Sequence, residues 1–261
     1  MRQKIVTGDC IQGMRTLEDG SFNLIIADPP YNLNKDFGQW KETEKRSEWK
    51  DWMHEWLKES LRLLSDRGNI FVYGIHHHQC WVQCMMYELG FLYRRQIIWS
   101  YENGFAGYSK RSLNAFYEPI LWFSKTDKYI YHPVREPYKS KERLKHKITK
   151  NGKVWKPHPD GRMAGDIWRF PTLAGRRFRE EKVDHPTQKP LSISTRLVRH
   201  FSDVGDTILI PFVGSGSECV AAVTEGRGFV GFELNPEYVK IANKRLADIK
   251  EEASLKFHLE G

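Results

Sequence analysis

The chain has 261 residues, 40% of them hydrophobic, and a formal net charge of +8. This length suits one large α/β domain or a domain with an inserted lobe, and no apolar run approaches the roughly 20 residues that span a bilayer, so no membrane association is expected. The N-terminus shows no signal peptide and the cysteines lack disulfide-framework spacing, which together favour a cytoplasmic protein.

The first 123 residues alternate short apolar runs with segments of helical periodicity. Strands are predicted over residues 22–27, 68–74, 95–100 and 117–123, and helices over residues 47–64 and 79–89. The first strand ends at two prolines, which cannot continue strand pairing. In the first helix Trp49, Trp52 and Trp56 recur at helical spacing. We interpret them as core residues rather than as a platform for stacking bases, and Ser47 is the candidate N-cap.

Residues 124–183 interrupt this pattern and carry most of the excess positive charge. Prolines, glycines and aromatic residues alternate there without a sustained period, over a length too great for a linker. Residues 125–182 hold 17 Lys and Arg against 7 Asp and Glu, while the rest of the chain holds 24 against 26. Such a basic lobe is typical of a surface that contacts phosphates, and a solvated basic surface is the alternative.

Regular α/β order returns after residue 183. Helices are predicted over residues 191–201, 218–225 and 236–249, strands over 207–210 and 228–232, and a glycine-rich loop over 211–217. Alternating strands and helices indicate a mostly parallel sheet that is covered on both faces. We therefore divide the chain into a catalytic half at residues 1–123, a basic insertion at 124–183 and a cofactor-binding half at 184–261.

The glycine-rich loop and the strand after it predict a site for an adenosine-containing ligand. Gly214 and Gly216 allow the backbone to approach a ligand closely. Glu233, at the end of the next strand, can accept hydrogen bonds from both ribose hydroxyls. The pattern is a poor dinucleotide fingerprint, because the third glycine of that fingerprint falls at Cys219.

The tetrapeptide Asp28-Pro29-Pro30-Tyr31 predicts chemistry on an exocyclic amine. Such a nitrogen is a poor nucleophile because its lone pair is delocalised into the ring. The Asp28 carboxylate and the Pro29 carbonyl can accept the amine hydrogens and direct the lone pair at a methyl donor, and the carboxylate stabilises the positive charge that develops. Prolines fix the backbone, and Tyr31 can stack on a flipped base. A local Pro-Pro turn with Asp as its acceptor is the alternative.

These motifs occur in an order that resembles the permuted β class of amino-group-specific DNA methyltransferases. Besides the catalytic tetrapeptide, the resemblance rests on segments 8–10, 185–190, 212–216 and 231–235, which read Gly-Asp-Cys, His-Pro-Thr-Gln-Lys-Pro, Phe-Val-Gly-Ser-Gly and Gly-Phe-Glu-Leu-Asn. Asp before Pro-Pro-Tyr is similar to the N6-adenine enzymes. The resemblance therefore implies methyl transfer to adenine N6, with cytosine N4 as the alternative target.

The resemblance also implies the fold, the cofactor and the partners. It implies a Rossmann-like α/β fold with a mostly parallel seven-stranded sheet, a target-recognition region at 124–183, and double-stranded DNA as the substrate. S-adenosylmethionine is the implied cofactor, bound by Asp9, Asp28, Lys189, Phe212, Gly214, Ser215, Gly216, Ser217, Glu233 and Asn235. Enzymes of this class often form homodimers; the sequence leaves open a homodimer and a cognate restriction endonuclease as partners.

One departure from the family pattern keeps other functions open. Ile210 stands where the family has Asp before Pro-Phe, which removes a carboxylate expected near the methionine end of the cofactor, and Ser217 replaces Thr. A non-catalytic DNA-binding module is therefore an alternative. So are an RNA substrate and a nicotinamide-dependent oxidoreductase, although the latter would not explain the catalytic tetrapeptide. No metal site is predicted, because the adjacent His76, His77 and His78 point in different directions.

Overall fold

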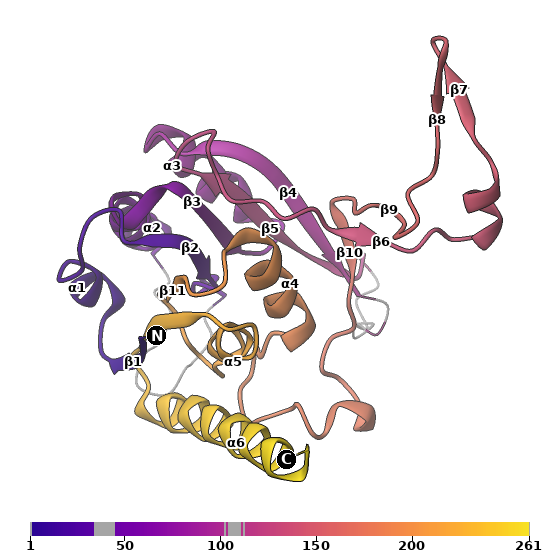
Figure 1. The fold of residues 1–261 in the computed structure, drawn as a ribbon. Coiled ribbons are helices and arrows are strands. Elements are labelled where there is room, and N and C mark those ends of the chain that lie inside the picture. Colours follow the sequence, from indigo (N-terminus) through magenta and orange to yellow (C-terminus); the bar gives the residue numbers. More distant parts are fainter. Residues whose placement is uncertain (1, 34–44, 102, 104–110, 112, 261) are drawn as a thin grey trace.

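The computed structural model describes residues 2–33, 45–101, 103, 111 and 113–260. Within these residues a central sheet has eight strands in the order β1-β12-β11-β2-β3-β5-β4-β10 (Figure 1). The strands are β1 (Gln3–Thr7), β2 (Phe22–Ala27), β3 (Leu64–Tyr73), β4 (Leu92–Ser100), β5 (Tyr117–Ser124), β10 (Ile167–Arg169), β11 (Thr207–Ile210) and β12 (Gly228–Glu233). Neighbours pair in parallel except β5, which is antiparallel to β3 and β4. The mostly parallel α/β sheet is confirmed.

The sheet has one strand more than the seven expected. The additional strand, β10, comes from the basic insertion and pairs in parallel with β4, where Trp168 lies opposite Trp99. Trp168 is buried, while its two neighbours in the strand are exposed. Because β10 is only three residues long and pairs with a strand far away in the sequence, local periodicity did not identify it.

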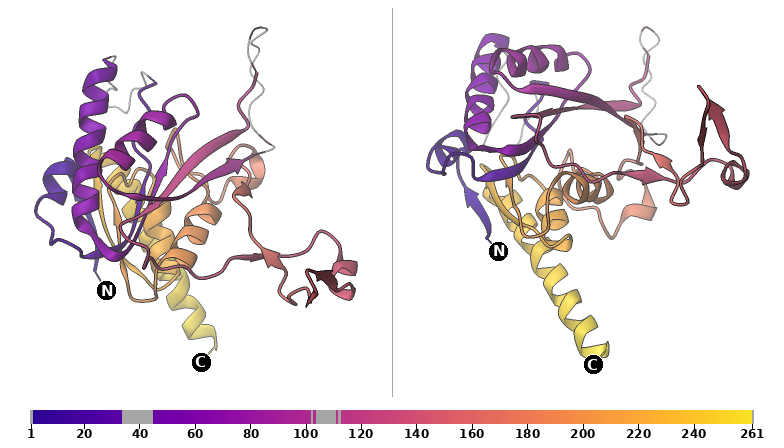
Figure 2. Two further views of the ribbon diagram at one scale, coloured as in Figure 1. Left: turned by 90° about the horizontal axis from the view of Figure 1, so that it is seen from above. Right: turned by 45° about the horizontal axis from the view of Figure 1, so that its top comes forward.

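Helices cover both faces of the sheet (Figure 2). The first face carries α1 (Cys10–Met14), α2 (Arg46–Leu63) and α3 (Gln79–Glu88), and the other carries α4 (Leu191–Phe201), α5 (Ser217–Thr224) and α6 (Pro236–Glu260). Each face has its own buried hydrophobic cluster. Met14, Trp56 and Met86 belong to the first cluster, and Leu197 and Ala242 to the second. The sheet is therefore the middle of three layers.

The spacing of apolar residues in α2 determines which side of the helix is buried. Trp49 and Trp56 are buried in the first cluster, as expected, whereas Trp52 is only partly buried and packs at its edge. The predicted N-cap is wrong. The helix begins at Arg46, so Ser47 lies inside its first turn, and the N-cap position belongs to Lys45. The ammonium of Lys45 pairs with the Glu48 carboxylate of the first turn at 2.9 Å.

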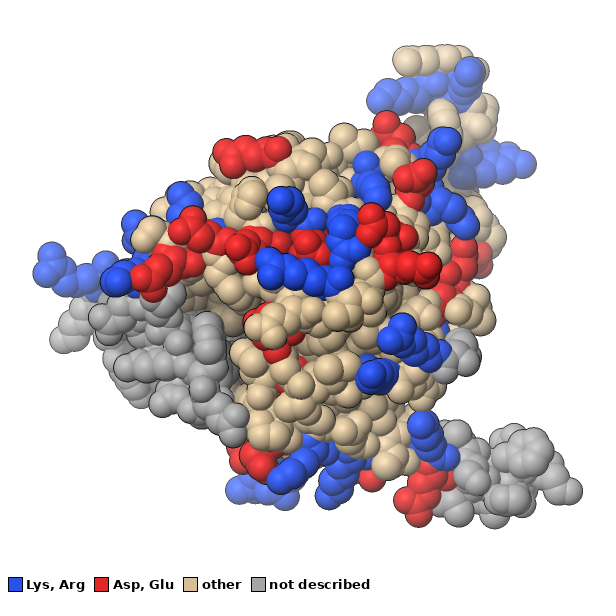
Figure 3. Space-filling view, turned by 90° about the vertical axis from the view of Figure 1, so that its left-hand side faces the viewer, with Lys and Arg blue, Asp and Glu red and all other residues tan. Residues whose placement is uncertain are grey.

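The basic insertion contains short and irregular elements. Strand β6 (Arg135–Glu136) pairs with β9 (Arg162–Met163), and β7 (Ile148–Lys150) pairs with β8 (Lys153–Trp155), both antiparallel. Two 3-10 helices, η1 (Lys141–Lys145) and η2 (Arg176–Phe178), complete it. The β7–β8 hairpin projects away from the sheet (Figure 1). The excess of basic residues in this insertion differs from the charge pattern of the face in Figure 3, where acidic and basic side chains are interspersed.

The carboxyl ends of the three neighbouring parallel strands β12, β11 and β2 meet at one edge of the sheet. Asp28 directly follows β2, the glycine-rich loop follows β11, and Glu233 ends β12. Ligands of open α/β sheets bind outside this edge. The topology therefore brings the predicted catalytic and cofactor residues together, although they lie about 200 positions apart in the chain. None of the described helices is both long and apolar enough to cross a membrane.

Candidate active site

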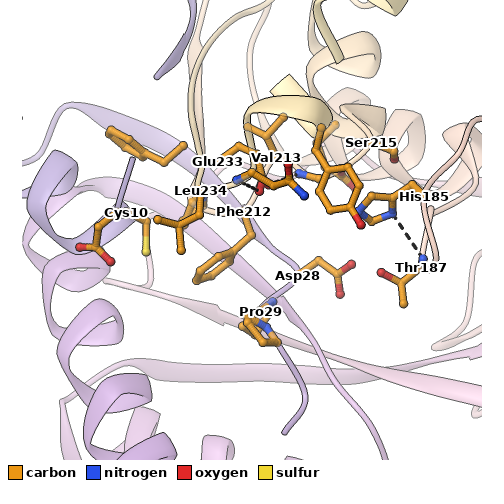
Figure 4. A pocket seen from close by; sticks show the side chains of 18 of the residues that line it. Cys10, Asp28, Pro29, His185, Thr187, Phe212, Val213, Ser215, Glu233 and Leu234 are labelled. Carbon is orange, nitrogen blue, oxygen red and sulfur yellow. Dashed lines mark hydrogen bonds between the residues drawn. The ribbon is translucent and has the colours of Figure 1, made fainter. Parts of the chain in front are cut away.

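A cavity of about 420 Å³ lies at the carboxyl ends of these strands (Figure 4). Most of the predicted site residues line it, namely Asp9, Asp28, Pro29, Pro30, Tyr31, Lys189, Phe212, Gly214, Ser215, Glu233 and Asn235. Gly216 and Ser217 are not among the lining residues. Gly216 is the N-cap of α5, with φ of 80°, and the buried Ser217 hydroxyl donates to the Lys189 carbonyl at 2.8 Å. These two residues support the wall of the cavity from behind.

Asp28 is held in a partly buried polar cluster with Tyr31, Lys189 and Glu118. The Tyr31 hydroxyl donates to Asp28 Oδ1 at 2.6 Å, and Lys189 Nζ lies 3.0 Å from Asp28 Oδ2. The same ammonium lies 3.3 Å from Glu118 Oε2 and donates to the Tyr31 hydroxyl at 3.1 Å. Both carboxylates of the cluster are therefore fixed by one lysine, and Asp28 is oriented from two sides.

The charged groups of this cluster determine one another's protonation states. Burial alone would lower the pKa of Lys189, but Asp28 and Glu118 outweigh burial and raise it, so the ammonium stays charged although only 5% of its side chain is exposed. Burial, together with the same two carboxylates, raises the pKa of the Tyr31 hydroxyl, which therefore stays protonated and can donate. Two carboxylates against one ammonium leave a net negative charge beside the cavity.

The backbone carbonyls of the tetrapeptide have different partners. The Trp49 indole N–H donates to the Pro30 carbonyl at 3.0 Å, and His78 Nδ1 lies 2.6 Å from the Tyr31 carbonyl. No group of the described residues donates to the Pro29 carbonyl. Pro29 lines the cavity, and Figure 4 shows it beside Asp28. Asp28 and Pro29, the residues predicted to supply the two acceptors, therefore lie side by side at the cavity.

Glu233 lies on the opposite side of the cavity, where two backbone N–H groups fix its carboxylate. Gly214 N donates to Oε2 and Asn235 N donates to Oε1, each at 2.8 Å. Burial raises the pKa of Glu233, and these backbone hydrogen bonds oppose the rise. Each oxygen still has a second lone pair, so the carboxylate can accept two hydroxyls of a ribose. Gly214 adopts φ of 48°, a conformation that favours glycine.

An apolar wall joins the two ends of the cavity. Phe212 packs between Trp52 and Trp56, with ring centroids 5.6 and 5.3 Å away. Trp52 and Leu234 line the cavity as well. The interpretation of Trp52 as a core residue was therefore incomplete, because helical spacing does not distinguish a core position from a cavity wall at the edge of the core.

Several lining residues were not predicted. His185 and Thr187 lie in the 185–190 segment, and Figure 4 shows the Asp28 carboxylate pointing toward both. Burial lowers the pKa of His185 to about 4, and its ring packs against Tyr238 at 4.5 Å between centroids. Glu118, in the buried cluster, stands in an otherwise apolar strand. A charged residue in such a strand was the only signal that the sequence offered for it.

The structure also places the residues around the departure from the family pattern. Ile210 is fully buried in the second hydrophobic cluster and does not line the cavity. A different carboxylate, Glu218 in the first turn of α5, does line it. Position 210 therefore gives the cavity no charge, and the carboxylates that face it are Asp9, Asp28, Glu218 and Glu233.

A Rossmann-like sheet with Asp28 and Glu233 lining one cavity at the carboxyl ends of its strands is the arrangement expected of an S-adenosylmethionine-dependent methyltransferase. The family described as DNA methylase, whose members act on N6 or N4 amino groups, matches residues 22–244 of this chain. The chain belongs to this family.

Named relatives and solved structures agree with this assignment. The chain is 32% identical to the type II methyltransferase M1.MboII of Moraxella bovis, over 92% of this chain and 95% of that protein. It is 31% identical to the DNA adenine methyltransferase YhdJ of Escherichia coli K12, over 93% of this chain and 82% of that protein. The structure of the M1.HpyAVI–SAM complex superposes with a TM-score of 0.63 at 22% identity, covering 94% of this chain and 99% of that one; it supports the fold.

Proposed function

We propose that this DNA methyltransferase methylates N6 of adenine in double-stranded DNA, with Asp28 and the Pro29 carbonyl as the groups that activate the amine. Adenine is favoured over cytosine by the named relatives, of which one is described as a DNA adenine methyltransferase. The observation that carries the proposal is the placement of Asp28 and Pro29 in the same cavity as Glu233. One cavity thus combines acceptors for an amine with an acceptor for a ribose.

The lining residues fit S-adenosylmethionine. Glu233 has free lone pairs for the ribose hydroxyls, and the apolar wall of Phe212, Trp52 and Leu234 suits an adenine ring. The net negative charge around Asp28 suits a cationic ligand. When bound, S-adenosylmethionine supplies an electrophilic methyl group on a positively charged sulfur.

The residues of the chain then account for the activation of the target. Asp28 accepts one hydrogen of the amine and the Pro29 carbonyl the other, so that the nitrogen lone pair is directed away from the ring system. As positive charge develops on the nitrogen, the ionised Asp28 stabilises it without having to move, because Tyr31 and Lys189 already fix its position. Tyr31 stacks on the flipped base, and its hydroxyl also orients Asp28.

The test is the identity of the product. The purified chain is incubated with tritiated S-adenosylmethionine and unmethylated duplex DNA, and the digested DNA is resolved into nucleosides. We expect the label in N6-methyladenine. Label in N4-methylcytosine would establish the alternative target, and transfer to RNA but not to DNA would contradict the substrate class. Intact cofactor binding without transfer to any DNA would indicate a non-catalytic module, and tight binding of NADH alone would favour the oxidoreductase.

We further propose that the basic segment at residues 124–183 recognises the target DNA. Its β7–β8 hairpin projects from the body (Figure 1), and a two-stranded ribbon fits the major groove. Lys150 and Lys153 lie opposite each other beside its turn, and 62% of Trp155 is exposed. Like charges on facing strand positions repel each other, so a polyanion would relieve an unfavourable contact.

The hairpin proposal predicts a change in the salt dependence of DNA binding. Replacing Lys150 and Lys153 with Gln should weaken binding to all duplexes and should reduce the slope of log K against log salt by about 1.8, since each phosphate contact contributes about 0.9. A matched pair, Lys58→Gln and Lys244→Gln, removes two exposed lysines from α2 and α6 and should leave the slope unchanged. An unchanged slope in the hairpin variant contradicts the proposal.

The finer expectations about partners and location belong to the proposal. A homodimer is expected from the resemblance, and sedimentation equilibrium of the full chain tests it. A cognate restriction endonuclease would cut DNA whose recognition site is not methylated. Genomic DNA of the host cell should therefore resist a host-cell extract that cleaves the same DNA in unmethylated form. We place the protein in the cytoplasm, where a bacterial-type enzyme of this family meets both DNA and S-adenosylmethionine.

A further inference from the structure

Glu218 is a buried carboxylate that lines the cavity and forms no ion pair with any of the described residues. Only 5% of the residue is exposed, and it lies in the first turn of α5. The Ser194 hydroxyl donates to its Oε1 at 2.9 Å. Among the ion pairs of the described residues none involves Glu218, whereas Asp28 pairs with Lys189. A buried charge without a partner is strongly unfavourable, so such a carboxylate indicates that a cation binds beside it.

The other carboxylates of the cavity already have partners. Glu233 accepts two backbone hydrogen bonds, and Asp9 accepts from Gln12 N at 2.8 Å as the N-cap of α1. Glu218 differs in that one serine hydroxyl is its only described side-chain partner. Of the carboxylates that line the cavity, Glu218 is therefore the one whose loss of hydration is least offset by groups of the protein.

A second polar group near Glu218 is buried without a hydrogen bond among the described residues. The Tyr73 hydroxyl is buried and makes no hydrogen bond among the described residues. Burial raises its pKa, and Glu218 is the nearby charge that contributes most to the rise. Burial likewise raises the pKa of Glu218, with Asp28 adding to the effect. Tyr73, Glu218 and Asp28 therefore share one corner. Together with Glu118, its three carboxylates outnumber the two cations that interact with them, Lys189 and Arg245.

The order of the strands determines which part of the cofactor this corner can meet. Glu233 ends β12, Glu218 lies in the first turn of the helix after β11, and Asp28 follows β2. Glu218 therefore comes from the segment after the middle of three adjacent strands. With the ribose at Glu233 and the reacting amine at Asp28, the methionine arm is the part of the cofactor that is left for this corner. Its α-ammonium is the cation that the arm provides.

We infer that Glu218 binds the α-ammonium group of the methionine moiety, so that a carboxylate on α5 supplies the charge that Ile210 cannot. The inference rests on the proposed function, because it takes S-adenosylmethionine as the ligand. It also gives a reason for the buried Ile210 side chain. A carboxylate at position 210 would add a further negative charge to a corner that already holds Glu218 and Asp28.

The test compares two ligands that differ in the methionine arm. S-adenosylhomocysteine carries the α-ammonium, whereas 5′-methylthioadenosine has the same adenosine without it. Binding of each to the full chain is measured by isothermal titration calorimetry. For Glu218→Gln we expect the affinity for S-adenosylhomocysteine to fall about 10- to 100-fold, as for a lost hydrogen bond between charged groups. The affinity for 5′-methylthioadenosine should stay within about twofold.

Two further variants separate the inference from the proposed function. Glu233→Gln should weaken both ligands alike, because both contain the ribose. Glu225→Gln, just beyond the end of α5 and paired with Arg199 at 2.6 Å, should change neither. The double variant Ile210→Asp/Glu218→Gln should recover part of the lost affinity for S-adenosylhomocysteine.

The outcomes are distinguishable. Unchanged affinity of Glu218→Gln for S-adenosylhomocysteine overturns the inference, and so does equal weakening of both ligands by the variant. In either case the proposed function stands if the wild-type chain binds S-adenosylhomocysteine. A wild-type chain that binds neither ligand refutes the proposed function itself.

Discussion

Replacing Asp28 with Asn tests how the site stabilises the charge that develops on the target nitrogen. The substitution keeps the shape of the side chain and removes its charge. In the wild-type protein a cation, Lys189 Nζ, lies 3.0 Å from Asp28 Oδ2, which is also the separation expected for a bound amine. At that distance, and at an effective dielectric constant of about 20, two unit charges interact by about 5.5 kcal/mol. If about half a unit charge develops on the nitrogen, the stabilisation is about 2.8 kcal/mol, or about 100-fold in kcat.

The assay is single-turnover transfer of tritium from labelled S-adenosylmethionine to duplex DNA, with enzyme in excess. We expect Asp28→Asn to lower the rate about 100-fold and Asp28→Ala to lower it further. The affinity for S-adenosylhomocysteine should change less than about threefold. Lys189 keeps Glu118 as an ion-pair partner at 3.3 Å, so the variant should fold. Asp51→Asn, at an exposed position of α2, is the matched control. A rate for Asp28→Asn within about threefold of the wild type would refute the reasoning.

Two predictions concern stability. The pKa of His185 is lowered to about 4 by burial from about 6.5 in the unfolded chain, so the free energy of unfolding should fall as the pH drops from about 6.5 to about 4, by about 3 kcal/mol in total. In urea titrations over this pH range, the free energy of unfolding of His185→Gln should fall less than that of the wild type. His54→Gln, at an exposed position of α2, is the control and should behave as the wild type. Identical pH dependence of all three proteins contradicts the prediction. Gly216→Ala should lower the free energy of unfolding more than Gly90→Ala does. Both glycines have positive φ, but a Cβ at position 216 would lie 2.7 Å from Ala242 Cβ, whereas a Cβ at position 90 would meet nothing within 4 Å. We expect about 1–2 kcal/mol of strain for both and about 1–3 kcal/mol more for Gly216, and equal urea midpoints would refute this.

The predicted site residues that the structure places at the cavity are mostly those with a local sequence signal. Asp28 and Glu233 lie at strand ends, and a glycine-rich loop indicates backbone conformations that other residues rarely adopt. The resemblance added Lys189, and the structure brings that side chain to Asp28. The partnership of Lys189 with Glu118 was not predictable, since it joins a charged residue in an apolar strand to a segment 71 positions away.

The misplaced or missing elements have physical explanations of the same kind. Strand β10 exists because Trp168 packs into the second cluster beside β4, a contact that has no local sequence signal. Ser47 is a good N-cap by composition, but the Lys45–Glu48 ion pair accompanies an earlier start of α2. Glu218 was noted only as the first residue of a helix. Its importance depends on burial and on the lack of an ion pair with the described residues, which are properties of the folded chain.

The pairing of β6 with β9 has a consequence for the exchange of specificity between related enzymes. It brings Glu136 opposite Arg162, and the two side chains form an ion pair at 3.2 Å. Residues 137–161, which include the β7–β8 hairpin, therefore leave and return through one closed neck. Closing a loop at such a neck costs little more for a longer insert than for a shorter one, about 0.6 kcal/mol for each doubling of length. A hairpin of different length and base preference could be grafted between Glu136 and Arg162 while the cavity and the sheet keep their geometry.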